Sequence, residues 1–541
     1  MKVNFLLLLF ICGALLTLAY FTYGKFLEKK LEIDPSRKTP AVELSDGVDY
    51  VATKKPVLLG HHFATIAGGG PIVGPITAVV FGWVPAVLWI IFGSIFMGGV
   101  HDYTSLQASI RHRGQSIGTI IKEYIGKRGQ TLFLIFSIAT LILIVGVFII
   151  LVADTFAAVP EAATASVLFI LLAPIFGFVV NQMRVNLFVA SIFGVIGMFL
   201  SIYIGMMFPI QLDSSVWSMI LIIYAYVASV LPVWVLLQPR DYLNSFLLYG
   251  MIIGATIGVI LFAPQIKYPA YVGFYNENLG YLFPILFITI ACGALSGFHS
   301  LVSSGTTAKQ LDNEKSGRFI TYGGMLIEAF LAVIAIGSVI YLSQAEFAAR
   351  LGELKTPIGM FSAGIGEFMS SFGLPMEIGT SFVALTVSAF LLTSLDSATR
   401  LGRYAVQEFC EERAPKLAKN PHAATAVVVA LAAVLALSGT WTTVWPIFGA
   451  ANQMLGALAL LAVTAWLAKR KTKTAFTAIP MVLMFIITLS ALVVIMQQNF
   501  IKGNYILVVI ASLLFVLCIA LVLEAWQTFT RTKTTDKSIK V

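Results

Sequence analysis

Apolar runs of 18 or more residues recur along this chain from one end to the other, and they constrain its fold more than any other feature. A helix that rises about 1.5 Å per residue needs about 20 such residues to cross roughly 30 Å of hydrocarbon. Inside lipid, each backbone amide must be hydrogen-bonded within its own segment, so runs of this kind form helices. Strands of a membrane β-barrel are shorter and alternate strictly between apolar and polar residues, unlike these runs. The sequence therefore predicts an all-α integral membrane protein.

The composition agrees with a chain that lies mostly in lipid. Of its 541 residues, 58% are hydrophobic and only 11% are charged, whereas soluble domains average about 25% charged residues. The four cysteines are scattered among apolar residues without the paired spacing of a disulfide or zinc site. We interpret them as small buried hydrophobic side chains. We expect no metal site at the intramembrane histidines either, because the consecutive residues His61 and His62 point about 100° apart on a helix and cannot both face one ion unless it unwinds.

We predict about fifteen membrane-spanning helices. Their approximate bounds are 4–23, 58–82, 84–111, 130–156, 163–181, 185–210, 216–237, 242–264, 281–306, 318–343, 377–409, 421–438, 444–467, 475–496 and 503–526. The expected parts of the chain are a first helix with a basic loop (1–57), two sets of five helices (58–210 and 211–409) and four accessory helices (410–541).

Lysine and arginine residues sort almost completely to one side of the membrane. When alternate connections are assigned to opposite sides, thirty of the 35 basic residues share a side, and the other side holds only Lys2, Lys267, Arg350, Lys355 and Lys502. Because cytoplasmic connections carry the basic residues, the N-terminus is expected outside and the C-terminus in the cytoplasm. The net charge of +9 then reflects topology, and we expect membrane lipid rather than nucleic acid as a partner.

Helix-breaking residues occur in the first helix of each set of five. Span 58–82 contains Gly68-Gly69-Gly70-Pro71, and span 216–237 ends through Leu231-Pro232-Val233-Trp234. Because five is odd, the second set runs through the membrane in the opposite direction to the first. Matching interruptions in two inverted repeats are typical of a transporter whose unwound backbone binds substrate. The alternative is that glycine and proline here only permit kinks and close packing.

Several segments of the sequence resemble one family, the carbon starvation protein CstA family. The segments are Gly60–Pro75, Gly99-Val100-His101-Asp102, Leu231-Pro232-Val233-Trp234 with Pro239–Leu243, Ser296-Gly297-Phe298-His299, Ser303–Thr307, Leu395–Arg400 and Trp445–Gln453, and the likeness covers roughly residues 24–470. The resemblance implies a secondary carrier of the bacterial inner membrane that takes up peptides or pyruvate when carbon runs short. It also implies a LeuT-like core of five plus five helices, here with one extra N-terminal and four extra C-terminal helices.

Two features depart from the family pattern. Family members commonly have two helices before the basic loop where this chain has one, and the long members extend further at the C-terminus. The core is unaffected by either difference, but the oligomeric state of long members does not transfer to this chain.

Ionisable side chains inside the membrane are functional candidates, because each costs about 2.5–3.5 kcal/mol to insert. The candidates for proton coupling are His61, His62, Asp102, Glu328 and Asp396, with His101 and His299 among the remaining intramembrane histidines. Asp396 has an alternative as the structural ion-pair partner of Arg400, four residues further on. For the adjacent histidines, the alternative is that one hydrogen-bonds a neighbouring helix. Glu328 has no basic residue three or four positions away, which favours a functional role.

A sodium ion is the other candidate for coupling, and no further cofactor is expected. In LeuT-like carriers, hydroxyl groups of the eighth core helix hold sodium against the broken first helix, and the corresponding residues here are Ser303, Ser304, Thr306 and Thr307. These hydroxyls could instead bond back to helix carbonyls, and Lys309 could substitute for a cation. The family resemblance favours the proton.

For the substrate, the unwound backbone at Gly68, Gly69, Gly70 and Pro71 suits a carboxylate, since half-helix N-termini attract anions. Tyr226 and Trp234 are candidates for an apolar wall of the same site, unless they serve packing. Pyruvate and short peptides both carry a carboxylate, so these residues do not separate them.

Two other function classes fit the sequence less well. An intramembrane enzyme would need a catalytic signature, and HExxH and GxxxxGK[ST] are both missing from the sequence. A nutrient sensor would need a signalling domain, but the longest connections, 24–57 and 344–376, are too short for one. We leave open whether 344–376 forms a lid or a re-entrant segment.

Overall fold

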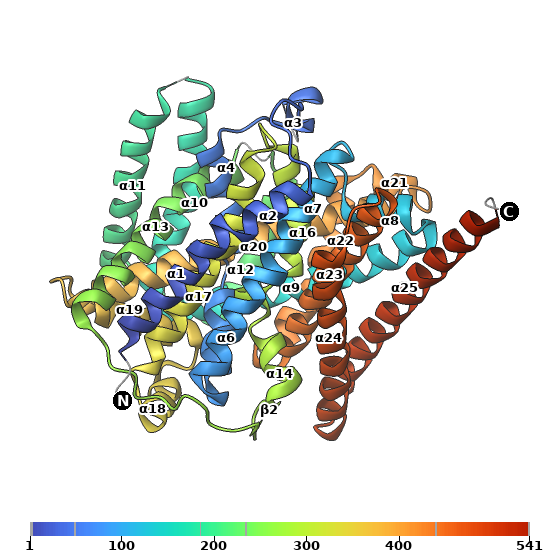
Figure 1. The fold of residues 1–541 in the computed structure, drawn as a ribbon. Coiled ribbons are helices and arrows are strands. Elements are labelled where there is room, and N and C mark those ends of the chain that lie inside the picture. Colours follow the sequence, from blue (N-terminus) through green and yellow to red (C-terminus); the bar gives the residue numbers. More distant parts are fainter. Residues whose placement is uncertain (1–3, 48–49, 184, 233–234, 439–440, 539–541) are drawn as a thin grey trace.

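The computed structural model describes residues 4–47, 50–183, 185–232, 235–438 and 441–538. This part of the chain is almost entirely helical (Figure 1). Its first helices are α1 (Phe5–Phe21), α2 (Tyr23–Lys30), α3 (Pro40–Glu43), α4 (Lys55–Ile66), α5 (Gly70–Ala78), α6 (Trp83–Gly93), α7 (Gly99–Arg111), α8 (Ile117–Tyr124), α9 (Lys127–Ala158), α10 (Pro160–Asn181), α11 (Leu187–Met207), α12 (Ser214–Val230) and α13 (Leu237–Phe262).

A short antiparallel strand pair, β1 (Tyr275–Asn276) and β2 (Gly280–Tyr281), leads into the second half of the chain. The helices that follow are α14 (Leu282–Thr289), α15 (Ala291–Ala294), α16 (Gly297–Gly305), α17 (Gly323–Ile340), α18 (Gln344–Leu354), α19 (Pro357–Ser370), α20 (Met376–Cys410), α21 (Pro415–Ala418), α22 (Pro421–Ser438), α23 (Trp441–Lys469), α24 (Ala475–Ile501) and α25 (Tyr505–Ser538).

The predicted all-α membrane protein is confirmed by the length and composition of these helices. Within the described residues, 12 helices are long and apolar enough to cross a membrane. The pair α4 and α5 is long and apolar enough only when the two helices are taken together, and it bends by 42° at its break; α12 is a shorter apolar helix. The predicted interruption at the glycines of span 58–82 is therefore present.

The predicted continuous helix over 281–306 is wrong, because the chain there is divided into α14, α15 and α16. At the second break, the Asn452 side chain of α23 accepts a hydrogen bond from the Phe298 amide at 2.8 Å. The Asn452 amide nitrogen also lies 2.9 Å from the Ser296 hydroxyl. A side chain of another helix thus satisfies a free amide in the first turn of α16, which a sequence-local pattern does not reveal.

The predicted span 216–237 ends earlier, at Val230, and α13 begins at Leu237 rather than near residue 242. Pro232 lacks a backbone N–H and disfavours helical geometry in the residue before it, so α12 stops there. The earlier start of α13 brings Arg240 and Asp241 into a buried helix instead of a connecting loop.

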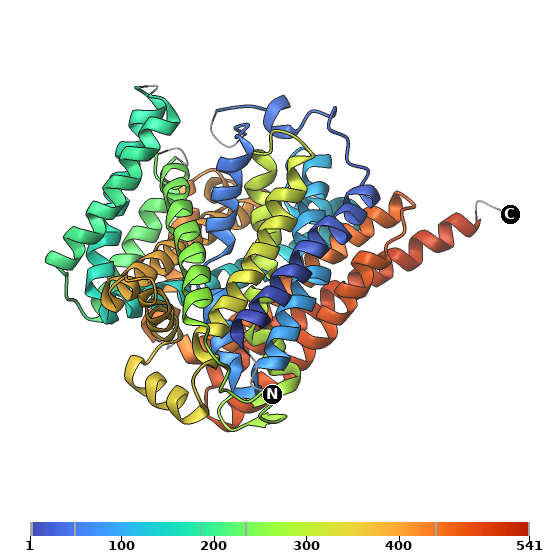
Figure 2. The ribbon, with the colours of Figure 1, turned by 60° about the vertical axis from the view of Figure 1, so that its left-hand side comes forward.

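The connections gather at two opposite ends of the molecule. The N-terminus, α18 and the β1–β2 pair lie at one end, while α3 and α21 lie at the other (Figures 1 and 2). The long helices α9 and α20 pack along each other through the middle, and α17 packs against α5. The hairpin of α10 and α11 stands at one edge of the bundle, and α24 and α25 stand at the opposite edge (Figure 1).

The segment 344–376 consists of two different helices. The α18 helix is amphipathic and mostly exposed, and Ser343 and Glu346 form a capping box at its start. The α19 helix is largely buried and packs against α13, α17 and α20. This segment is therefore part of the packed bundle and not only a surface loop.

Candidate functional site

The break between α4 and α5 lies in close contact with α15 and α20. A Cβ atom on Gly68 would come within 2.5 Å of the Ser394 hydroxyl. One on Gly70 would collide with the Cys292 side chain, and one on Gly74 would come within 2.5 Å of the Thr289 carbonyl oxygen. The glycines therefore permit two other helices to approach the unwound backbone, as the packing interpretation requires. The same break also leaves Gly68 and Gly69 outside any helix.

A small closed cavity lies beside this break, between α4–α5 and the start of α16. Its lining includes Gly68, Gly70, Cys292, His299 and Asn452, and its volume is about 10 Å³. That space holds about one water molecule. Two unwound segments, one in each half of the chain, thus meet at a common point inside the bundle.

Next to this point, four ionisable side chains converge from three helices. The His299 Nδ1 atom lies 3.4 Å from a carboxylate oxygen of Asp102 and 3.5 Å from one of Glu328. The His101 Nδ1 atom lies 2.7 Å from the other carboxylate oxygen of Asp102. The His299 ring also interacts with the backbone of Ile66, the last residue of α4. We call Asp102, His299 and Glu328 the carboxylate–histidine cluster.

The carboxylate–histidine cluster is fully enclosed. Asp102 and Glu328 have no exposed surface, and His299 is 1% exposed. Within the described residues, neither carboxylate accepts a well-aligned hydrogen bond, although imidazole nitrogens of His101 and His299 lie within 3.5 Å. Two carboxylates in such a place cannot both remain ionised unless a proton or cation compensates them. The arrangement is chemically suited to holding one proton or one small cation.

The two adjacent histidines of α4 make different contacts. The His62 Nδ1 atom lies 2.9 Å from the Thr307 hydroxyl oxygen. The His61 Nδ1 atom lies 2.8 Å from a carboxylate oxygen of Asp241 in α13. Both histidines therefore contact a neighbouring segment. The alternative considered from the sequence had given such a contact to only one of them.

His61 belongs to a second buried cluster, which we call the arginine cluster: His61, Tyr224, Arg240, Asp241 and Asp396. Arg240 pairs with Asp396 and with the Tyr224 hydroxyl, and it lies 3.1 Å from Asp241. The Tyr224 hydroxyl donates to Asp396 at 2.8 Å. Arg240 is 1% exposed and both aspartates are fully buried, so its one positive charge compensates one of the two carboxylates, and the imidazole of His61 lies beside the other.

Asp396 therefore does not pair with Arg400, the structural partner considered from its spacing. Arg400 instead donates to the carbonyl oxygens of Ala228 and Leu231 at 3.0 and 2.6 Å. These carbonyls belong to the C-terminal end of α12, where a cation is favourable and free acceptors need donors. The spacing of four residues along α20 places the two side chains on neighbouring turns but does not select their partners.

The four hydroxyl residues near the end of α16 are divided in their contacts. Ser304 and Thr306 donate to the carbonyls of Ser300 and Val302, each four residues earlier, at 2.8 and 2.9 Å. Thr307 contacts His62, as described above. The buried Ser303 hydroxyl has no hydrogen-bond partner among the described residues. Two of the four thus follow the back-bonding alternative.

The structure does not bring Tyr226 to the glycine break. The Tyr226 hydroxyl lies 3.2 Å from the Nδ1 atom of His422 at the start of α22. The other proposed wall residue, Trp234, lies outside the described residues. Within the described chain, no group of three or more histidine, cysteine, aspartate or glutamate residues is arranged to hold a metal ion.

Two neighbouring cavities lie towards the end of the molecule that carries α3 and α21. The outer cavity has a volume of about 370 Å³ and lies between α8, α9, α16 and α20. A smaller one, of about 30 Å³, is lined by His61 and Arg400. Both are lined by Gly305, Lys309 and Tyr404. The arginine cluster is therefore close to a polar cavity at the basic end, whereas the carboxylate–histidine cluster is closed.

Sequence reasoning missed Arg240, Asp241, Tyr224 and Asn452 as members of these buried polar networks. Arg240 and Asp241 follow Pro239, which suggested a connecting loop. The available signal was the polar group Gln238, Arg240, Asp241 and Asn244, which is unusual at the start of an otherwise apolar membrane helix.

The overall fold is shared with a known membrane transporter. The solved structure of the Eremococcus coleocola manganese transporter in complex with an aromatic bis-isothiourea substituted compound superposes with a TM-score of 0.50 at 10% sequence identity. The match covers 90% of this chain and 99% of that chain. Together with the broken helices that meet at a buried polar centre, this fold defines a multi-pass helical membrane protein.

The chain belongs to the carbon starvation protein CstA family, whose sequence profile matches residues 4–352 and 346–491. Peptide transporter CstA of Escherichia coli is 32% identical over 552 residues, which cover 88% of this chain and 78% of the relative. Pyruvate/proton symporter BtsT of the same organism is 33% identical over 567 residues, with 88% and 79% covered. Peptide transporter CstA of Bacillus subtilis is 32% identical and covers 83% of this chain and 82% of its own length. The predicted family is thus confirmed.

Proposed function

We propose that this protein is a proton-coupled secondary carrier of the bacterial inner membrane that takes up small carboxylates, either pyruvate or short peptides. The carboxylate–histidine cluster is the observation that carries the proposal. It contains two buried carboxylates beside the imidazole of His299, and the imidazole of His101 contacts Asp102 from the other side, so several proton acceptors lie within 3.5 Å of one another. Named relatives that include a pyruvate/proton symporter and peptide transporters support the same assignment.

In this proposal, Asp102, His299 and Glu328 hold the coupling proton next to the α4–α5 break. The amide groups of Gly68 and Gly69 at the start of α5 bind the substrate carboxylate, because a half-helix N-terminus favours an anion. The cavity beside them holds only about one water molecule, so this conformation is closed to substrate. Substrate entry then requires α16 or α20 to move away from the break, as alternating access demands.

The proposal also includes the orientation of the chain in the membrane and its internal repeat. The end with α3 and α21 faces the cytoplasm, and the N-terminus lies outside. The five-plus-five repeat and a LeuT-like core remain part of the proposal. The broken segment α14–α16 supports such a core, since it meets the broken α4–α5 segment inside the bundle.

Gradient-driven uptake into proteoliposomes tests the proposal. Labelled pyruvate, other short carboxylates and dipeptides and tripeptides are offered with an imposed proton gradient, and separately with a sodium gradient. We expect accumulation of at least one substrate with the proton gradient alone. Accumulation that needs sodium would assign coupling to Ser303 and the neighbouring hydroxyl residues in place of the carboxylate–histidine cluster. No accumulation under either gradient would contradict the carrier assignment.

The Glu328→Gln variant tests whether Glu328 carries the coupling proton. Its neutral amide keeps the size of the side chain but cannot release a proton, so we expect gradient-driven accumulation to be lost while exchange of substrate across the membrane persists. Glu353→Gln, on the exposed face of α18, serves as the matched control and should accumulate substrate normally. Full accumulation by Glu328→Gln would remove Glu328 from the coupling site.

A further inference from the structure

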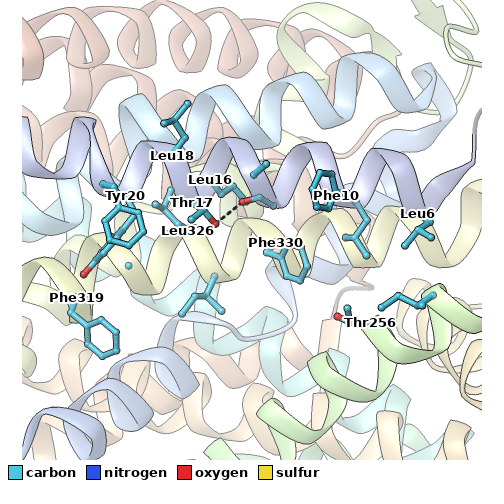
Figure 3. A pocket seen from close by; sticks show the side chains of 17 residues that line it. Leu6, Phe10, Leu16, Thr17, Leu18, Tyr20, Thr256, Phe319, Leu326 and Phe330 are labelled. Atoms are coloured by element: carbon cyan, nitrogen blue, oxygen red, sulfur yellow. Dashed lines mark hydrogen bonds between the residues drawn. The ribbon is translucent and has the colours of Figure 1, made fainter.

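A long apolar groove runs along the outside of the bundle between α1, α13 and α17 (Figure 3). Its volume is about 1040 Å³, and nearly all of its lining is apolar. Phe10 and Leu18, on the α1 wall, are 73% and 59% exposed. Thr17 uses its hydroxyl for the Gly13 carbonyl at 2.8 Å, so this polar group is satisfied within α1. A surface of this kind inside the membrane is suited to a hydrocarbon chain.

One end of the groove is basic. Figure 3 shows Tyr20 and Phe319 together at one end, and Leu6 and Thr256 towards the other. The ammonium group of Lys55 lies 4.2 Å from the centroid of the Phe319 ring. The guanidinium group of Arg318 lies 4.9 Å from the centroid of the Tyr20 ring. A cation therefore lies over each of the two aromatic rings that line this end of the groove.

The charges at this end differ in whether they are already neutralised. Arg318 is paired with Glu28 at 2.9 Å. Lys54 and Lys55, at the start of α4, are both exposed, and the described residues provide neither with a carboxylate partner. Lys55, which lies over the Phe319 ring of the groove lining, and Lys54, its neighbour in the chain, thus remain without a carboxylate partner at the end of the molecule that carries the basic connections.

We propose that this groove binds an anionic phospholipid of the cytoplasmic leaflet. An acyl chain lies along α1 and α17, and the phosphate is held by Lys54 and Lys55 above the Phe319 ring. Basic pockets between membrane helices on the cytoplasmic side bind anionic head groups for the same electrostatic reason. A second copy of this chain fits less well, because its apolar helices would leave the two lysines unpaired. The proposal does not depend on the transported substrate.

Native mass spectrometry of the detergent-purified protein tests the site. Phosphatidylglycerol and phosphatidylcholine with identical acyl chains are added in turn, and the bound fraction is measured against lipid concentration. We expect phosphatidylglycerol to bind more tightly, and each of Lys54→Gln and Lys55→Gln to weaken it about fivefold, because each lysine near an anionic surface contributes about that factor. Lys419→Gln, an exposed lysine after α21, is the matched control and should leave binding unchanged.

A second pair of variants tests the groove itself. Ala14→Trp places a large ring in the groove and should prevent binding of both lipids, whereas Leu15→Trp lies on α1 outside the groove and should not. Equal binding of the two lipids, or phosphatidylglycerol binding that survives the double lysine variant, contradicts the proposal. A dimer that Ala14→Trp converts to a monomer would show instead that a second copy occupies the groove.

Discussion

The adjacent histidines of α4 link the two buried clusters at the scale of single residues. Consecutive positions on a helix point about 100° apart. His61 therefore reaches Asp241 in the arginine cluster, while His62 faces Thr307 on the side of the carboxylate–histidine cluster. A rotation of α4 would change both contacts together. We therefore expect that binding or release of a proton at one cluster alters the contacts of the other cluster through α4.

The arginine cluster allows a prediction about stability at the same scale. Arg240→Gln leaves Asp396 buried without its cation, so we expect a loss of about 3–5 kcal/mol in unfolding free energy. The double variant Arg240→Gln with Asp396→Asn removes both charges, and it should recover most of that loss. Thermal unfolding of the purified protein in detergent measures both effects.

The uptake assay on the same variants separates two roles of Asp396. A stable double variant that transports normally would show that Asp396 is only a structural partner of Arg240. A stable double variant without gradient-driven uptake would place Asp396 among the coupling residues. Equal stability of the wild type and Arg240→Gln would contradict the buried ion pair.

At the scale of secondary-structure elements, the break between α4 and α5 depends on close packing against its glycines. Its glycines have no room for a side chain, since α15 and α20 press against them. We expect Gly70→Ala to destabilise the protein by about 1–3 kcal/mol through overpacking. It should also abolish uptake, because the added methyl group meets Cys292 at the point where the two broken segments touch. Unfolding in detergent and proteoliposome uptake measure the two effects.

Two further variants control this prediction. Gly352→Ala, in the exposed α18 helix, has open space around the new methyl group and should be neutral or slightly stabilising. Combining Gly70→Ala with Cys292→Gly removes the colliding side chain and should restore part of the stability. If Gly70→Ala behaves like Gly352→Ala, the close approach of α15 is not required.

The direction of the chain through the membrane is a prediction at the scale of the whole molecule. The four native cysteines are buried, so a single introduced cysteine can report its side of the membrane. We expect Lys355→Cys, at the end of α18, to react with a membrane-impermeant maleimide in spheroplasts, whose inner membrane is intact. Lys419→Cys, after α21, should react only once the membrane is opened. The reverse pattern would invert the topology derived from the basic residues.

The sequence by itself determined that the chain is a helical membrane protein, that span 58–82 is broken, and which family it belongs to. It also separated the connections into two sets, which the structure places at opposite ends. These properties depend on short stretches of chain: apolar length, glycine and proline content, and the charge of each connection. The locations of Glu328 and Asp102 inside helices were predictable for the same reason.

Only the tertiary structure decided which residues meet. Asp396 pairs with Arg240 of a distant helix and not with the nearby Arg400, and Asn452 of α23 stabilises the break before α16. Likewise, Asp102 and Glu328 acquire their significance from His299, which reaches both. Such partners are chosen by helix packing across long separations in the chain. Because a buried charge must be satisfied by whatever side chain packing brings to it, no local pattern could have named these partners.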